Sequence, residues 1–398
     1  HDATAEAPAE IGGVNFHRQL VSRLPDVGVT IFTVMSKMAE EYNAINLSQG
    51  FPDFSAPPRL LELLSKHAND GRNQYPPMTG VPHLREQIAQ KVANIYHCDV
   101  DPDSEITVTS GATEALFVAI QTVISAGDEA IIFDPAYDSY EPAIIMAGGS
   151  TAHVPLSSPN FTIDWDLVQA TINNRTKLLI LNSPHNPCGS ILTEADLESL
   201  ARIVEEHDLY VISDEVYEHM VFDNAKHLSM LCNERLRRRS FVVSSFGKTY
   251  HATGWKVAYC IAPTELTSEF RNIHQYVTFT THTPSQWAIA DFMHECPEHH
   301  LELSNFYQRK RDWFLQEMSG SRFKMSPSQG SYFQLADYSE ISDKGDVEFA
   351  NWLTQEIGVA AIPISVFYHS PPEQKIVRFC FAKDEKTLTA AATKLASI

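Results

Sequence analysis

The sequence predicts an α/β protein with a mainly parallel β-sheet that helices cover on both faces. From about residue 105 to 262, short β-branched apolar runs alternate with helical patterns. Five polar segments follow directly after such runs. From about residue 298 onward the chain changes to long amphipathic helices with few apolar runs, which indicates a second, smaller α/β domain.

Six apolar runs are the predicted strands of the main sheet, and they read EITVTS, EAIIFD, KLLILNS, LYVISDE, SFVVSS and KVAYCIA. A helical pattern between the third and fourth runs begins at an expected N-cap, Thr193, and has one apolar face made of Leu197, Leu200, Ala201 and Val204. Strands that alternate with helices of this length favour parallel neighbours buried on both faces.

The C-terminal part is predicted to begin with a long amphipathic helix, HLELSNFYQRKRDWFLQEMS. A hairpin-like segment, GSYFQLAD, follows, and then a strand, KIVRFCFAK, before a last helix. We expect the N-terminal segment to join this part of the chain. The expected division is therefore a large domain over 48–297 and a small domain made of 1–47 and 298–398.

Composition favours small molecules over nucleic acid or membranes as partners. The hydrophobic fraction of 43% and the charged fraction of 20% are ordinary for a globular protein. A net charge of −20 opposes non-specific binding to nucleic acid and to anionic membranes, and no apolar run approaches the ~20 residues that would span a bilayer. We therefore expect no nucleic-acid and no membrane partner.

The six cysteines lie far apart and form no C-x-x-C pair, so we expect reduced thiols in a cytoplasmic protein. The opening segment HDATAEAPAE has neither the basic nor the apolar region of a secretory signal. The sequence does not begin with Met, so it does not decide whether a targeting segment upstream was removed.

The five polar segments after strands are TSGATEA, DPAYDSY, NSPHNPCG, SDEVYEH and SSFGKTY. Because active sites of such sheets lie beyond the carboxyl ends of the strands, we expect these segments to converge on one site. SGATEA resembles a turn that opens a helix, where free backbone N–H groups favour an anion such as phosphate. No dinucleotide fingerprint occurs, and FGKT is not a P-loop because Val242 occupies the first glycine position.

Asp214 ends a strand that is apolar enough to be buried, and Lys248 stands at the junction of two apolar runs about thirty residues later. Each residue alone has an ordinary explanation, a capping aspartate and a surface lysine. Together with an anion cradle they match the needs of pyridoxal phosphate, which requires a lysine amine, a carboxylate beside its ring nitrogen and a phosphate site.

From Leu24 to the C-terminus the sequence resembles the fold type I, class I/II aminotransferases, within the branch of methionine, kynurenine and glutamine aminotransferases. The motifs that carry this resemblance stand in the family's order: NLSQGFPDF, NQYPPMTG, SGATEAL, FDPAYDSYEP, LNSPHNPCG, ISDEVYEH, SSFGKTYHATGWKVAYC and AAIPISVFY followed by VRFCFAK. The resemblance implies the PLP fold type I, with a mainly parallel seven-stranded sheet in the large domain and a smaller α/β domain. It also implies a homodimer with shared active sites.

The resemblance implies that Lys248 carries the cofactor as a Schiff base, that Asp214 pairs with the ring nitrogen, and that Tyr217 and Asn186 bind the ring's phenolate oxygen. Tyr137 would stack on the ring. The phosphate would be held by Ala112, Thr113, Ser245 and Lys256, with Tyr75 supplied by the partner subunit. Lys256 departs from the wider family, in which arginine is frequent at this position.

For the substrate, the resemblance implies that Arg378 binds the α-carboxylate as a bidentate pair, with Gly50 and Asn186 beside it. Phe279, Phe32 and Phe51 align with walls of the side-chain pocket, and Phe367 adds a further ring. Aromatic walls favour an apolar side chain or methionine, whose sulfur makes favourable contacts with rings. The alternative is that these phenylalanines only pack an interface.

The implied activity is transfer of the amino group of methionine or an aromatic amino acid to a 2-oxo acid, with kynurenine and glutamine as further candidate donors. A carbon–sulfur β-lyase on the same fold is the alternative, since it shares the cofactor residues. A cofactor-sensing transcription regulator would need a basic DNA-binding extension, which the N-terminal segment does not offer. No metal is expected, because the group His294, Cys296, His299 and His300 matches no zinc spacing and is interpreted as solvated surface. RLRRR at 235–239 is expected to pair with local acids.

Overall fold

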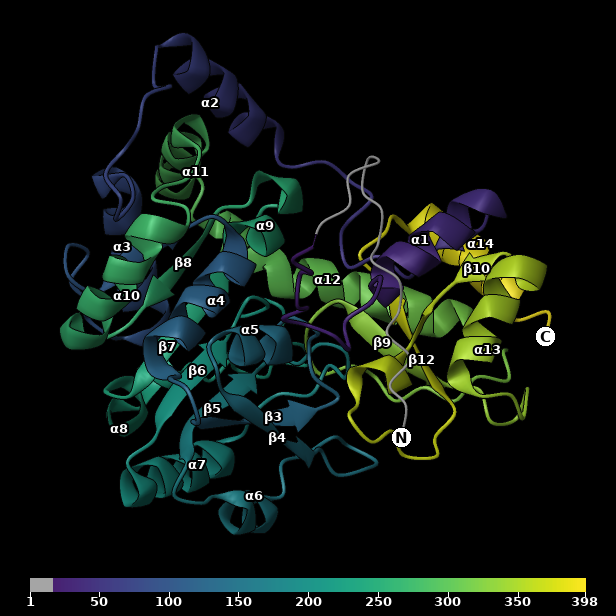
Figure 1. The fold of residues 1–398 in the computed structure, drawn as a ribbon. Helices are drawn as coiled ribbons and strands as arrows, with labels where there is room; N and C mark the ends of the chain where they lie inside the picture. The colour runs from purple at the N-terminus through teal and green to yellow at the C-terminus, as the bar shows by residue number, and fades with distance from the viewer. Residues whose placement is uncertain (1–16) are drawn as a thin grey trace.

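The computed structural model describes residues 17–398 and is built around a seven-stranded sheet (Figure 1). The order across the sheet is β2-β8-β7-β6-β5-β3-β4. The strands are β2 (Ile106–Thr109), β3 (Glu129–Asp134), β4 (Ser150–Pro155), β5 (Thr176–Asn182), β6 (Tyr210–Asp214), β7 (Ser240–Ser245) and β8 (Ala258–Ile261). The predicted α/β class and the mainly parallel seven-stranded sheet are confirmed.

All six predicted strands occur, and only β8 runs antiparallel to its two neighbours. β4 was not predicted, because it is an edge strand in which half of the residues of STAHVP are polar and only Val154 is buried. β3 and β7, by contrast, are buried at every position, which explains why they read as continuous apolar runs.

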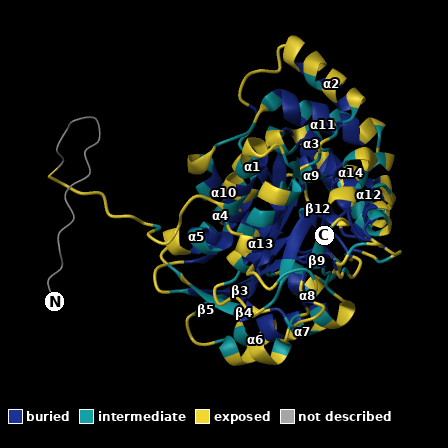
Figure 2. Cartoon of the chain, turned by 90° about the vertical axis from the view of Figure 1, so that its right-hand side faces the viewer, coloured by how far each residue is buried: buried dark blue, intermediate teal, exposed yellow. Residues whose placement is uncertain are grey.

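Helices cover both faces of the sheet. Because side chains alternate between the two faces along β6, Val211 belongs to the larger hydrophobic core on one face and Ile212 to the smaller core on the other. The smaller core includes residues of α4 (Gly111–Val123), α5 (Tyr140–Met146) and α10 (Thr264–Val277). The larger core includes residues of α3 (Pro82–Tyr96) and α7 (Glu194–His207). Figure 2 shows the buried strands enclosed by helices that expose one side.

The predicted start and face of α7 are confirmed. The Thr193 side chain accepts a hydrogen bond from the Asp196 N–H at 3.2 Å, and the Asp196 carboxylate accepts one from the Thr193 N–H at 2.8 Å. A capping box of this kind satisfies two backbone donors and contributes about 1 kcal/mol. Leu197, Leu200 and Val204 are buried against the sheet, and so is Ala201.

The C-terminal part of the chain contains α12 (Glu298–Glu317), β9 (Phe333–Asp337), α13 (Asp346–Trp352), β10 (Val359–Ala360), β11 (Ile362–Pro363), β12 (Ile376–Cys380) and α14 (Glu385–Leu395). Three of these strands form an antiparallel sheet of order β11-β12-β9. The predicted hairpin at GSYFQLAD was wrong in detail. Only an isolated bridge joins Lys324 to Asp337, because the strand partner of β9 is β12, about forty residues later.

The N-terminal elements α1 (Ile31–Glu41) and β1 (Ile45–Asn46) lie beside these C-terminal elements (Figure 1). β1 pairs in parallel with β10, and α1 contacts β10 and β11. This is the association expected from the sequence, whereas the exact domain bounds at 47/48 and 297/298 stay a prediction.

The other helices are α2 (Pro58–Asn69), α6 (Trp165–Thr171), α8 (Glu234–Arg237), α9 (Phe246–Thr249) and α11 (Thr283–Glu295). Short 3₁₀ segments span Met230–Cys232, Thr253–Trp255 and Ile364–Phe367, and a π-helical turn spans Leu353–Ile357. Within residues 17–398, every helix is too short or too polar to cross a bilayer. All six cysteines are unpaired.

Two surface interpretations had different outcomes. The arginines of RLRRR pair with acids as expected, for example Arg235 with Glu198 and Glu205, and Arg239 with Asp208. The interpretation of the His294 group as solvated surface was wrong for two of its members. His300 is buried against His219, and His299 packs on Tyr250, because the start of α12 lies over the segment that follows Lys248.

Candidate active site

A cavity of about 160 Å³ lies beyond the carboxyl ends of the central strands. Every predicted cofactor residue except Tyr75 lines it: Ala112, Thr113, Tyr137, Asn186, Asp214, Tyr217, Ser245, Lys248 and Lys256. The parallel register explains this convergence, because β5, β6 and β7 end at the same edge of the sheet. β8 runs antiparallel to β7 and therefore begins at this edge, so Lys256, two residues before β8, also lines the cavity.

Asp214 is the last residue of β6 and is 4% exposed. The Tyr140 hydroxyl donates a 2.6 Å hydrogen bond to its carboxylate, and the Val216 N–H donates a longer one at 3.4 Å. Burial raises the pKa of Asp214 to about 6, although the bond from Tyr140 favours the ionised form. The carboxylate is thus held in place but lacks a full positive partner.

Lys248 lies in α9, directly after β7. Its Nζ donates hydrogen bonds to the Gly50 carbonyl at 3.2 Å and to the Tyr332 hydroxyl at 3.3 Å. Burial lowers the pKa of Lys248 to about 8, so its amine is partly neutral near physiological pH.

An anion cradle lies at the other end of the cavity, where α4 begins. Ser110 stands at the N-cap position and makes no side-chain cap, so the first N–H groups of this helix have no side-chain acceptor. Gly111 has a φ of +82°, and a Cβ there would lie 2.7 Å from the Lys256 Nζ. The helix N-terminus and an ammonium group therefore face the same small space, which suits a phosphate.

Arg378 lies on β12 and is completely buried. Its guanidinium donates to the Asn186 side-chain oxygen at 2.8 Å and to the Ser48 carbonyl at 2.9 Å, while its Nε has no hydrogen-bond partner. Burial lowers the pKa of Arg378 to about 10. The hydrogen-bond partners of this guanidinium are thus neutral oxygens, and the centre of the Phe333 ring is 3.8 Å away.

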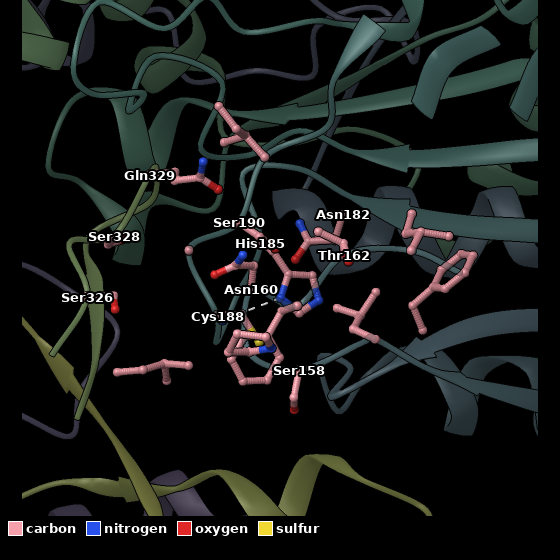
Figure 3. A pocket seen from close by; sticks show the side chains of 18 of the residues that line it. Ser158, Asn160, Thr162, Asn182, His185, Cys188, Ser190, Ser326, Ser328 and Gln329 are labelled. Atoms are coloured by element: carbon pink, nitrogen blue, oxygen red, sulfur yellow. Dashed lines mark hydrogen bonds between the residues drawn. The ribbon is translucent and has the colours of Figure 1, made fainter. Parts of the chain in front are cut away.

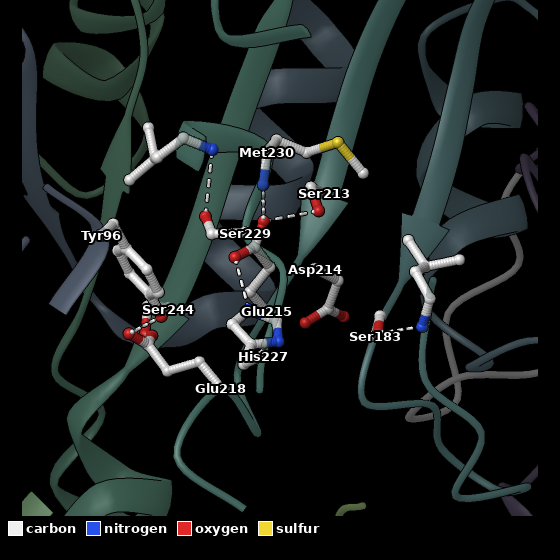
Figure 4. Close-up of polar contacts among 12 residues, drawn as sticks. Tyr96, Ser183, Ser213, Asp214, Glu215, Glu218, His227, Ser229, Met230 and Ser244 are labelled. Atoms are coloured by element: carbon white, nitrogen blue, oxygen red, sulfur yellow. Dashed lines mark hydrogen bonds and ion pairs between the residues drawn. The ribbon is translucent and has the colours of Figure 1, made fainter. Parts of the chain in front are cut away.

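A buried polar network lies next to Asp214, around the carboxylates of Glu215 and Glu218 (Figure 4). Because side chains alternate along a strand, Asp214 faces the cavity while Ser213 and Glu215 face away. The Glu215 carboxylate accepts a hydrogen bond from Ser213 at 2.8 Å and lies 2.9 Å from the His227 ring nitrogen. Glu218 is bound by Lys91, Tyr96 and Ser244. These contacts fix the ends of β6 and β7.

The predicted pocket-wall phenylalanines fall into three groups. Phe32 and Phe367 pack together with ring centres 5.8 Å apart, and the Phe32 ring lies 5.5 Å from the Arg378 guanidinium. Phe51 lies under the Lys383 ammonium, 5.5 Å from its ring centre. Phe279 packs against Tyr75 at 5.4 Å. Within the described residues, no ring contact joins Phe51 or Phe279 to the first pair.

Gly50 is placed beside Lys248 through its carbonyl oxygen. Tyr75 lies outside the cavity and is 84% exposed. One chain therefore does not bring Tyr75 to its own phosphate cradle.

A larger cavity of about 810 Å³ is lined in part by His185, Cys188 and Ser190, from the same loop as Asn186 (Figure 3). None of the predicted site residues lines it, and its labelled side chains are mostly neutral hydroxyls and amides. Its charged residues have partners: Lys324 pairs with Glu340 at 3.1 Å, Asp196 accepts from the Trp165 indole at 2.9 Å, and Asp337 accepts from the Ser339 N–H at 2.7 Å. The ionisable groups thus gather in the smaller cavity, and size alone does not locate the chemistry.

Sequence reasoning missed Tyr140, Tyr332 and Phe333. Tyr140 could have been found, since it ends the strand-end segment DPAYDSY that also contains Tyr137. Tyr332 and Phe333 had no such signal, because they precede and begin a strand of a different sheet.

Comparisons with known proteins agree with this geometry. The family model described as "Aminotransferase class I and II" matches residues 42–395. The chain is 52% identical over 374 residues to the methionine aminotransferase of Escherichia coli K12, covering 94% of this chain and 97% of that protein. It is 34% identical over 409 residues to human kynurenine–oxoglutarate transaminase 1, covering 94% and 96%.

Solved structures give the same result. The crystal structure of an Escherichia coli protein, described as having a methionine aminotransferase function, matches with a TM-score of 0.94 at 51% identity. The match covers 96% of this chain and all of that one (100%).

Proposed function

This chain belongs to the class I and II aminotransferases, and from that premise we propose that it uses pyridoxal phosphate to move an amino group from methionine or an aromatic amino acid to a 2-oxo acid. Kynurenine and glutamine are further candidate donors. The names of the relatives support this range, since one is a methionine aminotransferase and another a kynurenine transaminase.

The observation that carries the proposal is the content of the 160 Å³ cavity. It combines a lysine amine of lowered pKa, a buried carboxylate and a helix N-terminus with an adjacent ammonium group. The residues fit pyridoxal phosphate, because the uncapped start of α4 and Lys256 suit its phosphate, and Asp214 suits a protonated ring nitrogen. When bound, this cofactor supplies an electron sink for the bonds at the substrate Cα.

Lys248 is proposed to attach the cofactor and, when free, to move a proton at its Nζ. An amine with a pKa of about 8 is present in both protonation states near neutral pH, so it can accept and return a proton. Asp214 is proposed to hold the ring nitrogen protonated, and the Tyr140 hydroxyl fixes the carboxylate for this contact.

Arg378 is proposed to bind the substrate α-carboxylate. Among the described residues, its buried guanidinium donates only to neutral oxygens and its Nε–H has no acceptor, so a substrate carboxylate would supply a charged hydrogen-bond partner. Phe32 and Phe367 lie beside the Arg378 guanidinium and are proposed to form the apolar wall for the substrate side chain. A methionine or aromatic side chain is favoured there, because an acidic one would be desolvated without a partner.

Borohydride treatment of the purified protein tests the cofactor assignment. Reduction should attach the cofactor permanently to one lysine, and peptide mapping by mass spectrometry should identify Lys248. Lys256 is the internal control, since it lines the same cavity. A cofactor adduct on Lys256 or on any other lysine would contradict the assignment.

A panel of amino donors tests the substrate range. Methionine should be used with a kcat/KM at least about tenfold above that of aspartate, the scale of one lost interaction of ~1.4 kcal/mol. Oxo-acid product, pyruvate and ammonia are measured together. Cysteine S-conjugates, whose sulfur is on Cβ, test the alternative: release of the thiol with pyruvate and ammonia, in place of the oxo acid that retains the sulfur, would favour the β-lyase instead.

A homodimer with shared sites is part of the proposal. Tyr75 and Tyr276 are 84% and 89% exposed, and Val277 is 44% exposed, so large apolar groups lie on the surface near Phe279. A second copy of the chain would cover them and could bring its Tyr75 to the phosphate cradle. Size-exclusion chromatography with light scattering measures this, and a monomeric active enzyme would contradict it.

A further inference from the structure

The Tyr332 hydroxyl forms a closed triangle with two groups of the candidate active site. It donates a 2.5 Å hydrogen bond to the Gly50 carbonyl and accepts one from the Lys248 Nζ at 3.3 Å. The Lys248 Nζ also donates to the Gly50 carbonyl at 3.2 Å. Three distant parts of the sequence therefore meet at one amine.

The fold holds Tyr332 rigidly in this position. Tyr332 is completely buried, and its carbonyl accepts a hydrogen bond from the Phe381 N–H at 2.9 Å. The turn before it is fixed as well: the Ser331 N–H donates to the Met220 carbonyl at 2.9 Å, and a Cβ on Gly330 would lie 2.7 Å from Pro184. The hydroxyl is thus directed by tight packing on both sides.

The surroundings of the Lys248 amine give this contact a specific role. The charged or titratable groups that act on it are Cys380, Asp214, Arg378 and Lys256. The phenol rings of Tyr217 and Tyr332 lie 5.4 and 5.7 Å from its Nζ. No carboxylate donates or accepts a hydrogen bond with Nζ among the described contacts, so the direct hydrogen-bond partners are the neutral oxygens of Tyr332 and Gly50.

We propose that Tyr332 is a positioning residue that, with the Gly50 carbonyl, holds the Lys248 amine in place whenever that amine is not bonded to the cofactor. This inference rests on the proposed function and adds a residue to it. A free lysine side chain has four rotatable bonds, and two fixed acceptors restrict its Nζ to one location. Proton transfer at the substrate Cα would then start from a defined position.

The contact also predicts the sign of a measurable change. An acceptor that receives a hydrogen bond from an ammonium group stabilises the charged form. Tyr332→Phe removes that acceptor and retains the ring. The titration midpoint of Lys248 should therefore fall by about 0.5 to 1 pKa unit, given the usual strength of one hydrogen bond.

Competitive labelling of the full-length apoprotein measures this midpoint directly. An amine-reactive reagent is applied from pH 6 to 11, and the labelled fraction of the Lys248 peptide is followed by mass spectrometry in wild type and Tyr332→Phe. Tyr307→Phe is the matched control, because Tyr307 is equally buried and its ring centre is 5.6 Å from that of Tyr332, but its hydroxyl lies 3.0 Å from the His251 Nδ1 instead of contacting Lys248. Tyr307→Phe should leave the midpoint of Lys248 unchanged.

An unchanged midpoint in Tyr332→Phe, or an equal shift in both variants, would overturn the proposal. Thermal unfolding of each apoprotein verifies folding. If Tyr332→Phe does not fold, 3-fluorotyrosine at position 332 alone serves instead, since its more acidic phenol is a weaker acceptor and should shift the midpoint in the same direction.

The loaded enzyme gives an independent measurement. Loss of positioning should lower kcat of Tyr332→Phe by about tenfold and leave KM for the amino donor within about twofold. A rise in KM at unchanged kcat would contradict the role. Failure of borohydride to label Lys248 would overturn the proposed function itself, whereas the apoprotein titration reports on Tyr332 alone.

Discussion

The 160 Å³ cavity and the group of predicted pocket-wall phenylalanines differ in how one chain assembles them. Nine of the ten predicted cofactor residues, all except Tyr75, come together from several strand ends to line the cavity. The phenylalanines are dispersed: Phe32 and Phe367 adjoin Arg378, Phe51 lies with Lys383, and Phe279 lies with the exposed Tyr75.

The two regions also differ in electrostatics. The cavity holds ionisable groups in an unfavourable environment, since burial lowers the pKa of Lys248 and raises that of Asp214. The phenylalanine groups need no such arrangement, because apolar rings lose nothing on burial. Buried charges without a partner destabilise the folded protein in the absence of ligand, and a ligand that pairs with them stabilises it. Five predictions address this contrast, beginning with the largest effect.

Asp214→Asn should lower kcat by roughly 10²- to 10³-fold, because a neutral amide cannot keep the ring nitrogen protonated. Steady-state kinetics with methionine measure this. Glu215→Gln is the matched control, since Glu215 is adjacent but faces the His227 side of the sheet. Turnover of Asp214→Asn at the wild-type rate would show that the carboxylate is not part of the chemistry.

The same substitution should stabilise the apoprotein above pH 6 by about 3 kcal/mol. The pKa of Asp214 is raised from 3.8 in the unfolded chain to about 6 in the folded one. Between these two pH values the folded wild-type protein binds more protons than the unfolded chain, so its free energy of unfolding falls as the pH rises. Above pH 6 Asp214 is ionised, and the full cost of burying its charge remains.

Urea unfolding of wild type and Asp214→Asn at pH 4, 5, 6 and 7.5 isolates this effect. The difference in free energy of unfolding between the two proteins should be small at pH 4, should grow as the pH rises, and should become constant above pH 6. A difference that does not change with pH would mean that the buried carboxylate carries no such cost.

Arg378→Lys should reduce kcat/KM for methionine by roughly 10²-fold, about 3 kcal/mol, since an ammonium group cannot make the bidentate contact with a carboxylate. The loss should appear for every amino donor. Arg59→Lys, at an exposed ion pair with Glu295, should have no effect on the kinetics. An effect confined to one donor would argue against binding of the common α-carboxylate.

Phe32→Ala should lower kcat/KM for methionine by about tenfold and change that for aspartate much less, since only the apolar contact is lost. Phe51→Ala should have a smaller effect, because Phe51 lies with Lys383 rather than with Arg378. If all donors fell equally in Phe32→Ala, the phenylalanines would be packing an interface, which was the alternative interpretation of the sequence.

Tyr75→Phe should weaken cofactor binding by a factor of about two to ten, the effect of one hydrogen bond. Mixing Tyr75→Phe with Lys248→Ala subunits should give hybrids in which one site has both residues intact. Fluorescence titration with the cofactor compares hybrids with the parents. Identical affinities would contradict a site shared between subunits.

The sequence alone determined six strands of the sheet and the residues at their ends, because both depend on short-range patterns. Apolar runs such as SFVVSS specify buried strands, and parallel strands place the residues that follow them at one edge. Asp214, Ser245 and Lys248 therefore meet wherever those strands pair. Thr193 and Asp196 specify the start of α7 for the same local reason.

Only the tertiary structure decided which residues from other sheets and segments reach that edge. Tyr332 precedes β9 of the three-stranded sheet and contacts Lys248 across 84 residues of sequence. β4 could not be predicted because an edge strand is buried too little to require an apolar run. Such contacts depend on how whole sheets pack, which side-chain periodicity along one segment does not encode, whereas the convergence of strand ends follows from backbone hydrogen bonding alone.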